Sequence, residues 1–193
     1  ISLKLDWDYF IALSQTTKKK LISNNVDYKK IKTIYAGVDI NTNFKKKNSD
    51  YFRILTVSRL VNYKRVDLLI KACKVLFNKD YKFSVLIVGD GLLKEKLNDL
   101  IRKNNLQNTI KIKSKLSRED LIYEFVNSDL FVLTSEEEGF GMVVIEAASL
   151  KVPFVVTNID TLKEITKNGL GGLFFKKGDY KDLAEKISKF IKD

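Results

Sequence analysis

Three consecutive stretches decide the fold: FRILTVS (Phe52–Ser58), KRVDLLIKACKVLFNK (Lys64–Lys79) and FSVLIVGDG (Phe83–Gly91). The first and third are short apolar runs rich in β-branched residues, which is typical of strands buried on both faces. The second has apolar residues at helical spacing: Val66, Leu69, Ile70, Cys73, Leu76 and Phe77. This order predicts two parallel strands joined by a helical crossover.

The same alternation continues to the carboxyl end of the chain. Further strands are predicted at residues 109–114, 129–135, 152–157 and 171–175, and helices at 92–104, 117–128, 141–150, 161–167 and 179–192. Asp90 and Gly91 are expected to start a helix, and Ser117 and Asp179 to cap two others. Six such units predict an α/β fold, a Rossmann-like doubly wound parallel sheet with helices on both faces. Ligands of such sheets bind beyond the carboxyl ends of the strands, so the loops after strands are the places to look for a site.

The first fifty residues have a different pattern. A strand is predicted at 7–14, a short helix at 16–24 and a strand at 30–37, before the polar stretch NTNFKKKNSD at 41–50. That stretch has the composition of a linker. We therefore expect residues 1–45 to be the tail of a preceding α/β domain with its crossover, and residues 46–193 to form a ligand-binding domain.

The composition excludes several kinds of chemistry. Lys and Arg number 35 against 24 Asp and Glu, which gives a formal charge of +11, and there is no histidine. Without histidine there is no Ser-His-Asp or Cys-His nucleophile system and no imidazole metal ligand. A single cysteine, Cys73, excludes an internal disulfide and a thiolate zinc cluster, and it is expected to be inert core. At 45% apolar residues the chain is not a disordered basic tail.

The charge and the start of the chain bear on partners and location. A +11 surface attracts polyanions, although the abundance of Lys, Ile and Asn also fits an AT-rich coding bias. Nucleic acid is disfavoured, because no aromatic-basic box, zinc finger or helix-turn-helix is found. The chain starts at Ile1 without a signal-peptide pattern or an apolar run long enough to span a bilayer, so we expect a processed or truncated chain in the cytoplasm. Peripheral association with an anionic membrane surface, or with a lipid-linked acceptor, is an alternative that the charge supports.

The loop SRLVNYKR follows the first of the six strands. Arg59 lies at the strand end and Lys64 at the start of the next helix. An Arg fork, a Lys and a helix amino terminus together favour a diphosphate ligand. The alternative is two surface cations without a ligand.

The loop SEEEGFGMVVIEA follows the strand at 129–135. Glu138 precedes Gly139, Phe140 and Gly141, and Glu146 lies in about the second turn of the next helix. The glycines allow close approach of the backbone to a ligand, and carboxylates bind vicinal hydroxyls, so a sugar or a ribose is the expected partner. Apolar neighbours indicate that this helix is buried, and a buried Glu146 needs a partner.

The loop after the strand at 83–88 and three aromatic residues are predicted to be structural. The loop VGDGLLKEK lacks both the P-loop pattern and the GxGxxG spacing, so it is predicted to be a turn. Phe140, Tyr63 and Tyr9 are expected to pack rather than to stack on a ligand.

Taken together, these segments resemble the C-terminal, donor-binding domain of a GT-B glycosyltransferase of the retaining family-4, group 1 type. The strand–Arg–Leu–Lys–helix element at 54–72, the strand and turn at 83–97, the Glu-x7-Glu signature around Gly-Phe-Gly at 138–146 and the closing segment at 168–187 stand in the family's order. The resemblance also covers residues 8–39, which look like the end of the family's N-terminal domain. Two departures are Lys151, where the family has a small residue before its Val-Pro, and the loop NIDTLKEI, in which only Glu164 matches a Gly-Gly-Pro-Glu pattern.

The resemblance implies a role for each candidate. Arg59 and Lys64 would hold the donor diphosphate, and Glu138 with the backbone of residues 139–141 would face the sugar and phosphate. Glu146 would bind the ribose hydroxyls, and Lys115 and Leu116 would flank the base.

The resemblance also implies what the chain lacks. The donor would be a nucleotide-diphosphate sugar, with no metal and no other cofactor, because the Asp-x-Asp metal motif of the other glycosyltransferase fold is missing. The acceptor site would belong to an N-terminal domain absent here, so this chain alone is expected to be inactive. The rival interpretations are a non-catalytic nucleotide-sugar binding module and an epimerase or phosphorylase of the same architecture.

Overall fold

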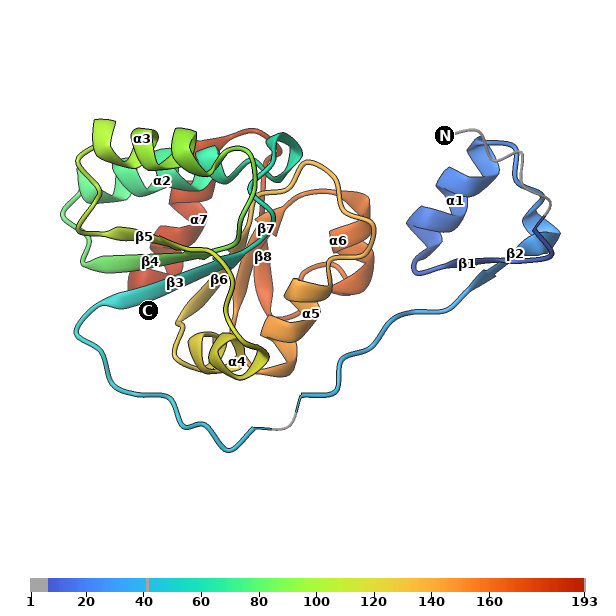
Figure 1. The fold of residues 1–193 in the computed structure, drawn as a ribbon, viewed down its shortest axis with the longest axis horizontal. Helices are drawn as coiled ribbons and strands as arrows, with labels where there is room; N and C mark the ends of the chain where they lie inside the picture. Colours follow the sequence, from blue (N-terminus) through green and yellow to red (C-terminus); the bar gives the residue numbers. More distant parts are fainter. Residues whose placement is uncertain (1–6, 41, 193) are drawn as a thin grey trace.

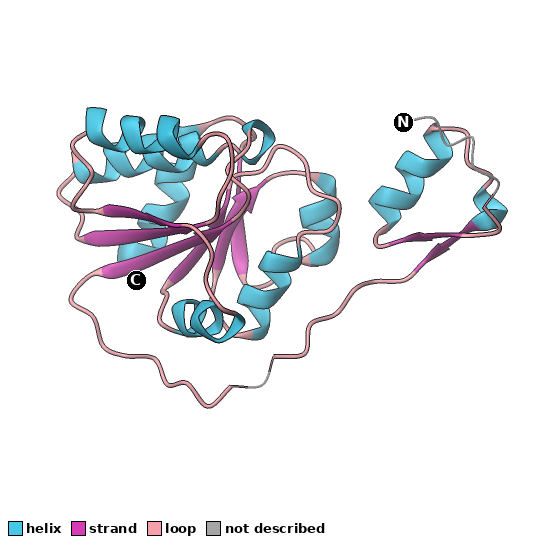
Figure 2. Ribbon diagram, viewed as in Figure 1, coloured by secondary structure: helices cyan, strands magenta, loops and turns pink. Residues whose placement is uncertain are grey.

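The computed structural model describes residues 7–40 and 42–192. A main body of sheet and helices is joined by a long irregular connection to a small amino-terminal segment, as Figure 1 and Figure 2 show. The predicted fold class is confirmed: six parallel strands form one sheet with helices on both of its faces.

The strand order of the main sheet is β5-β4-β3-β6-β7-β8, and every pairing in it is parallel. The order reverses between β3 and β6, which is the position where doubly wound sheets bind ligands. The strands are β3 (Phe52–Val57), β4 (Phe83–Val88), β5 (Ile110–Lys113), β6 (Leu130–Leu133), β7 (Phe154–Thr157) and β8 (Gly172–Phe175).

Helices cover both faces of this sheet (Figure 1). One face carries α2 (Val66–Phe77), α3 (Lys94–Lys103) and α7 (Tyr180–Lys192). The other carries α4 (Arg118–Val126), α5 (Met142–Ser149) and α6 (Asp160–Ile165). Every residue of β6 and β7 is buried, as the apolar runs predicted for strands covered on both sides. Cys73 lies on the buried face of α2, in the core.

The amino-terminal segment is a β–α–β unit. Its strands β1 (Phe10–Ala12) and β2 (Ile31–Thr33) are parallel, with α1 (Gln15–Ser23) and a 3-10 turn, η1 (Tyr28–Lys30), between them. It has a small core of its own, formed by Ala12, Val26 and Ile31. Residues 34–40 and 42–51 lie between it and β3 and have no regular structure.

Local details confirm some sequence predictions and correct others. Ser117 accepts the backbone N–H of Asp120 at 3.0 Å, and Asp179 accepts two N–H groups of the first turn of α7, so both caps are present. Asp90 and Gly91 form a turn, as predicted for this loop, but α3 begins at Lys94, two residues after the predicted start at 92.

Lys151 occupies a position that favours glycine. It follows α5 with a φ of 59°, in the left-handed region that commonly ends a helix. Only glycine adopts that region freely, so the physical reason for a small residue at this position is the backbone conformation.

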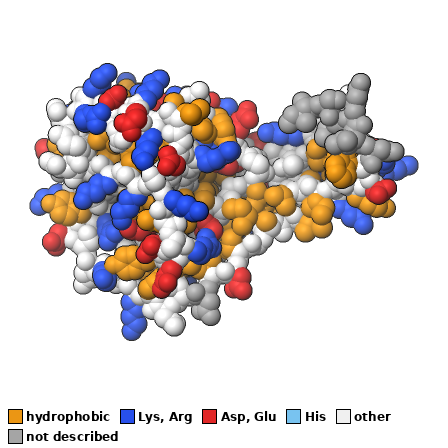
Figure 3. Space-filling view, viewed as in Figure 1, with side chains coloured by type: hydrophobic (Ala, Val, Ile, Leu, Met, Phe, Trp, Pro, Cys, Tyr) orange, Lys and Arg blue, Asp and Glu red, His pale blue; other side chains and the backbone are white. Residues whose placement is uncertain are grey.

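The surface is strongly basic but mixed. Figure 3 shows Lys and Arg side chains spread over the visible face among carboxylates, rather than gathered in one patch. Within residues 7–40 and 42–192, no helix is both long enough and apolar enough to cross a membrane.

Gly89 allows the loops after β3 and β4 to meet. An added Cβ would lie 1.8 Å from the carbonyl oxygen of Ser58, which is backbone and cannot move aside. Beside it, Leu60 donates its N–H to the carbonyl of Asp90 at 2.8 Å, so the ladder of the two strands continues into their loops. Close contact at Gly89 therefore fixes the distance between two walls of the site described below.

Replacing Gly89 by alanine should force these loops apart. We expect Gly89→Ala to lower the free energy of unfolding by about 1–3 kcal/mol, as overpacking does. The matched control is Gly37→Ala, where an added Cβ meets nothing within 4 Å and a change of about 0.5 kcal/mol or less is expected. Urea denaturation measures both, and equal effects of the two substitutions would contradict the close-contact explanation.

Candidate functional site

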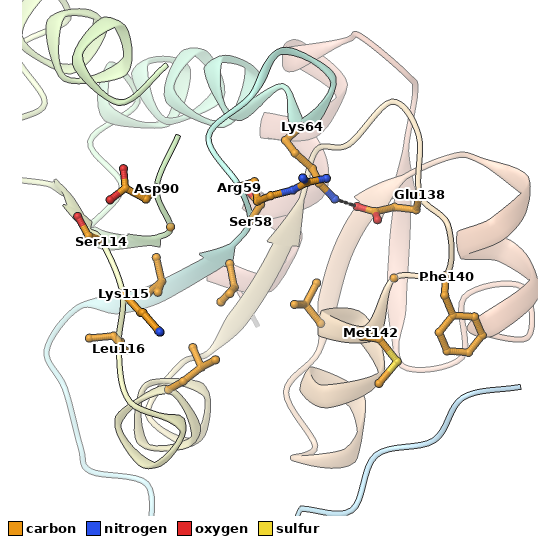
Figure 4. A pocket seen from close by; sticks show the side chains of 16 residues that line it. Ser58, Arg59, Lys64, Asp90, Ser114, Lys115, Leu116, Glu138, Phe140 and Met142 are labelled. Carbon is orange, nitrogen blue, oxygen red and sulfur yellow. Dashed lines mark hydrogen bonds and ion pairs between the residues drawn. The ribbon is translucent and has the colours of Figure 1, made fainter. Parts of the chain in front are cut away.

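A cavity of about 660 Å³ lies at the carboxyl ends of the strands, where the strand order reverses. This volume is within the range of small-molecule sites. Its walls come from the loops after β3, β4, β5 and β6 and from the first turn of α5 (Figure 4). The predicted position of the site, after the strands that end before Ser58 and Ser135, is where the cavity is found.

Most of the sequence candidates line this cavity. They are Arg59, Lys64, Lys115, Leu116, Glu138, Phe140 and Gly141. Gly139 and Glu146 do not line it, because Gly139 turns its carbonyl toward α1 and Glu146 is covered by an ion pair. Asp90, which the sequence marked only as part of a turn, does line it. Its pKa is lowered, first by the hydrogen bond that its carboxylate accepts from the N–H of Gly91.

The basic wall of the cavity is formed by Arg59 and Lys64. Lys64 Nζ lies 2.5 Å from Glu138 Oε1, and the two side chains are only 13% and 10% exposed. Arg59 donates a hydrogen bond to the hydroxyl of Tyr63, and Figure 4 shows its side chain directed toward the Lys64–Glu138 pair. Two cations and one carboxylate thus converge at one end of the cavity and leave an excess of positive charge there.

The backbone around Lys64 is fixed by the β6 loop. Thr134 donates its hydroxyl to the carbonyl of Lys64 at 2.7 Å, and Glu136 donates its N–H to the carbonyl of Tyr63 at 2.8 Å. These bonds tie the loop after β3 to the loop that carries Glu138, so neither end of the Lys64–Glu138 pair moves independently of the other.

Arg65 adds a second tie between these loops. Its φ is 47°, in the left-handed region, and its guanidinium pairs with both Asp67 and Glu136. Burial alone would raise the pKa of Asp67, but hydrogen bonds from Arg65 and Lys71 outweigh it and lower that pKa. The sequence analysis did not single out Arg65, because its partners become visible only when β3 and β6 are paired.

Glu146 has a partner that the sequence did not indicate. Arg118 at the start of α4 donates to Glu146 Oε1 at 2.6 Å, and the Glu146 side chain is 11% exposed while that of Arg118 is 52% exposed. The expectation that a buried Glu146 requires a partner is therefore confirmed. The carboxylate is not open to solvent, because Arg118 of α4 covers it.

Away from the Lys64–Glu138 pair, Leu116 marks the apolar end of the cavity (Figure 4). Leu121, Val57, Val88 and Val143 also line the cavity and belong to the same hydrophobic cluster as Leu116. Such a surface suits the flat face of a nucleotide base or another apolar group. Lys115 lines this part of the cavity, and Lys94 donates to the hydroxyl of Ser114 at 2.5 Å beside it.

Of the three aromatic residues predicted to pack, Phe140 is buried, whereas Tyr63 and Tyr9 are exposed. Phe140 is buried and packs against the Tyr35 ring, with 6.5 Å between their centroids, as predicted for a packing residue. Tyr63 and Tyr9 are 37% and 63% exposed and are not core residues. The Tyr63 ring instead lies beside the two site cations, 5.8 Å from Arg59 Cζ and 5.3 Å from Lys64 Nζ.

The residues that the structure describes contain no group of three His, Cys, Asp or Glu placed to hold a metal ion.

A doubly wound sheet with cations at its switch point is typical of proteins that bind phosphorylated nucleotides. Over residues 38–193 the chain matches the family model described as glycosyl transferases group 1. The protein therefore belongs to the group 1 glycosyltransferase family.

Individual relatives agree with this assignment. The chain is 31% identical to the capsular polysaccharide biosynthesis glycosyltransferase CapM of Staphylococcus aureus, over 95% of this chain and 52% of CapM. It superposes with a TM-score of 0.85 at 25% identity on a mutant of S. aureus TarM solved with fondaparinux, α-GlcNAc-glycerol and UDP, covering 96% of this chain and 37% of TarM. For HepE of Anabaena solved with UDP-glucose, the TM-score is 0.83 at 25% identity, over 96% and 54% of the two chains.

These matches also define what part of the family is present. The chain spans about half the length of the curated relatives it matches. Its main sheet is the Rossmann-like half of a GT-B glycosyltransferase.

The Glu146–Arg118 pair can be tested by a double-mutant cycle. Arg118→Ala leaves a nearly buried carboxylate without its partner, so we expect it to lower the free energy of unfolding by about 1–3 kcal/mol. Glu146→Gln leaves a half-exposed Arg118 that water can solvate, so a smaller loss of about 1 kcal/mol or less is expected. Urea denaturation of both variants and of the double variant should show non-additive losses; strictly additive losses would mean that the pair is not coupled.

Proposed function

We propose that this chain forms the nucleotide-sugar binding half of a glycosyltransferase that moves a hexose from a nucleotide-diphosphate sugar to an acceptor with retention of configuration. The observation that carries the proposal is the convergence of Arg59 and Lys64 on Glu138 at the switch point of the sheet. Membership of the group 1 family supports it.

In the proposed reaction the bond between the anomeric carbon and the diphosphate oxygen breaks, and the nucleoside diphosphate leaves as an anion. Arg59 and Lys64 would stabilise the charge that develops on the leaving group. The first turn of α5, whose residues Gly141–Val143 line the cavity, would add backbone N–H groups. The proposal assigns this neutralisation to protein groups and requires no metal or other cofactor.

The Lys64–Glu138 pair is the part of the site that must change when the ligand binds. In the structure, Glu138 is the partner of Lys64. A diphosphate would compete for the same ammonium group, and Glu138 would then face the sugar. Glu138 therefore opposes binding of the bare diphosphate. It favours a ligand whose hydroxyls can donate hydrogen bonds to its carboxylate.

The nucleoside would lie toward the apolar end of the cavity. Leu116 and Lys115 would flank the base. Glu146 would accept hydrogen bonds from the ribose hydroxyls after Arg118 moves away from it. The TarM and HepE structures contain UDP or a UDP-sugar, so we propose uridine as the base to test first.

We propose that the acceptor site belongs to a second half that corresponds to the part of CapM outside the match, and we expect this chain alone to bind the donor without transferring it. The chain matches about half the length of CapM, which supports that division. Donor binding without turnover in the full-length protein would instead favour a non-catalytic binding module.

Removing either cation should weaken nucleotide binding. Charge-assisted hydrogen bonds contribute about 1.5–3 kcal/mol, so Arg59→Ala and Lys64→Ala should each raise the dissociation constant for UDP by about 10- to 100-fold. Arg102→Ala is the matched control, because Arg102 lies exposed on α3, does not line the cavity and forms a surface ion pair with Asp99. Isothermal titration with UDP, GDP and ADP measures the change, and unaltered affinity in both site variants would refute the diphosphate assignment.

Glu138 should affect UDP and UDP-sugar in opposite directions. Glu138→Gln removes the carboxylate that competes for Lys64, so we expect UDP to bind about threefold or more tightly. The same variant loses a charge-assisted contact to the sugar, so the affinity for the UDP-sugar should fall by about tenfold. Paired titrations of the variant with both ligands decide, and a parallel change in the two affinities would contradict the assigned role.

A further inference from the structure

The loop that carries Glu138 is held from two sides by threonine hydroxyls. Thr161 on α6 donates to the carbonyl of Glu138 at 3.2 Å. Thr17 on α1 donates to the carbonyl of Gly139 at 3.0 Å. We call these two contacts on the loop the clamp. Thr161 belongs to the main domain and Thr17 to the amino-terminal segment.

Packing contacts reinforce both sides. A Cβ added to Gly141 would lie 2.8 Å from Leu162 Cδ2 and 3.1 Å from Ile165 Cδ1, so α6 lies directly against the loop. On the other side, the Tyr35 ring packs on Phe140. The loop 138–141 is thus enclosed between α6 and the amino-terminal segment.

Glu164 joins these two sides to each other. Its Oε1 accepts the N–H of Gln15 at 2.6 Å and the hydroxyl of Tyr35 at 2.7 Å. Its Oε2 accepts the N–H and the hydroxyl of Thr16 at 2.9 and 2.8 Å. One carboxylate of α6 thereby receives four hydrogen bonds from the amino-terminal segment.

The charge of Glu164 suits this position. The first N–H groups of a helix lack partners within the helix and carry partial positive charge, and α1 has no acidic residue in its own first turn. Burial alone would raise the pKa of Glu164, but the hydrogen bonds from Gln15, Thr16 and Tyr35 outweigh it and lower that pKa. An amide could not replace the carboxylate, because its NH2 group would face other donors.

We propose that Glu164 is a positioning residue for the donor site: by holding α1 and Tyr35 against α6, it closes the clamp that fixes the Glu138–Gly141 loop. Glu164 lies outside the residues that line the cavity, so its effect on a ligand is indirect. The part of this inference that concerns nucleotide binding rests on the proposed function.

The experiment compares three variants of this chain. Glu164→Gln disrupts the acceptor of the hydrogen bonds from Gln15, Thr16 and Tyr35. Thr17→Val keeps these Glu164 contacts but removes the hydroxyl that donates to Gly139 and accepts from Ser14. Glu185→Gln is the matched acid-to-amide control, because Glu185 is exposed on α7 and forms surface ion pairs with Lys186 and Lys189. Hydrogen exchange of the amides in α1 and in the loop 138–141 is measured together with the affinity for the UDP-sugar.

We expect Glu164→Gln to speed exchange of the Gln15 and Thr16 amides and of the loop by about tenfold and to weaken UDP-sugar binding by about five- to tenfold. Thr17→Val should affect the loop and the affinity but leave exchange at Gln15 and Thr16 near the wild-type rate. Glu185→Gln should change none of these quantities.

Two results would overturn the proposal. Faster exchange in α1 with an unchanged loop would show that Glu164 stabilises the amino-terminal segment only, and so would an unchanged affinity. If the wild-type chain binds no nucleotide, the proposed function fails, but the exchange of the loop still decides whether Glu164 positions it.

Discussion

The pairing of β3 with β6 is the constraint on which the site depends. These strands are far apart in the sequence, yet they meet where the strand order reverses, with Ile54 opposite Leu130. We call this junction of the two strands and their loops the β3–β6 seam. A side chain also bonds across it, because the Thr56 hydroxyl donates to the carbonyl of Val132 at 2.6 Å. Beyond the strands, the two loops stay joined by backbone bonds and by the Lys64–Glu138 pair. The basic wall of the cavity and its carboxylate are therefore two sides of one seam.

This seam explains why charged groups can be held at low exposure. A buried ion is costly unless it is paired and hydrogen-bonded, and here three of the charged groups in or beside the site have partners from different elements. Lys64 has Glu138, Arg65 has Glu136, and Glu146 is covered by Arg118. A ligand that replaces one of these partners meets a group already oriented by the backbone, so little ordering remains to be done on binding.

The sequence predicted the sheet because the six strands and their helices have clear periods, and it predicted the position of Arg59, Lys64 and Glu138 because post-strand loops meet at one edge. It did not predict the Arg118–Glu146 pair or the hydrogen bonds between Glu164 and the amino-terminal segment. Their partners lie 28 and up to 149 residues away, and no local pattern encodes which long side chains will meet. The turn at Asp90 and Gly91 was predicted, but α3 begins two residues later than expected, because the residues after an Asp-Gly turn can belong to the turn or to the helix.

The most direct test of the account is to map UDP-glucose binding on the chain by amide NMR shifts. The account predicts that the largest changes fall on residues 58–66, 114–118 and 138–146, which surround the cavity at the β3–β6 seam. It also predicts smaller changes at Gln15 and Thr16, transmitted through Glu164. Shifts confined to the opposite end of the sheet or to the groove between α2 and α3, with none at the seam, would contradict it.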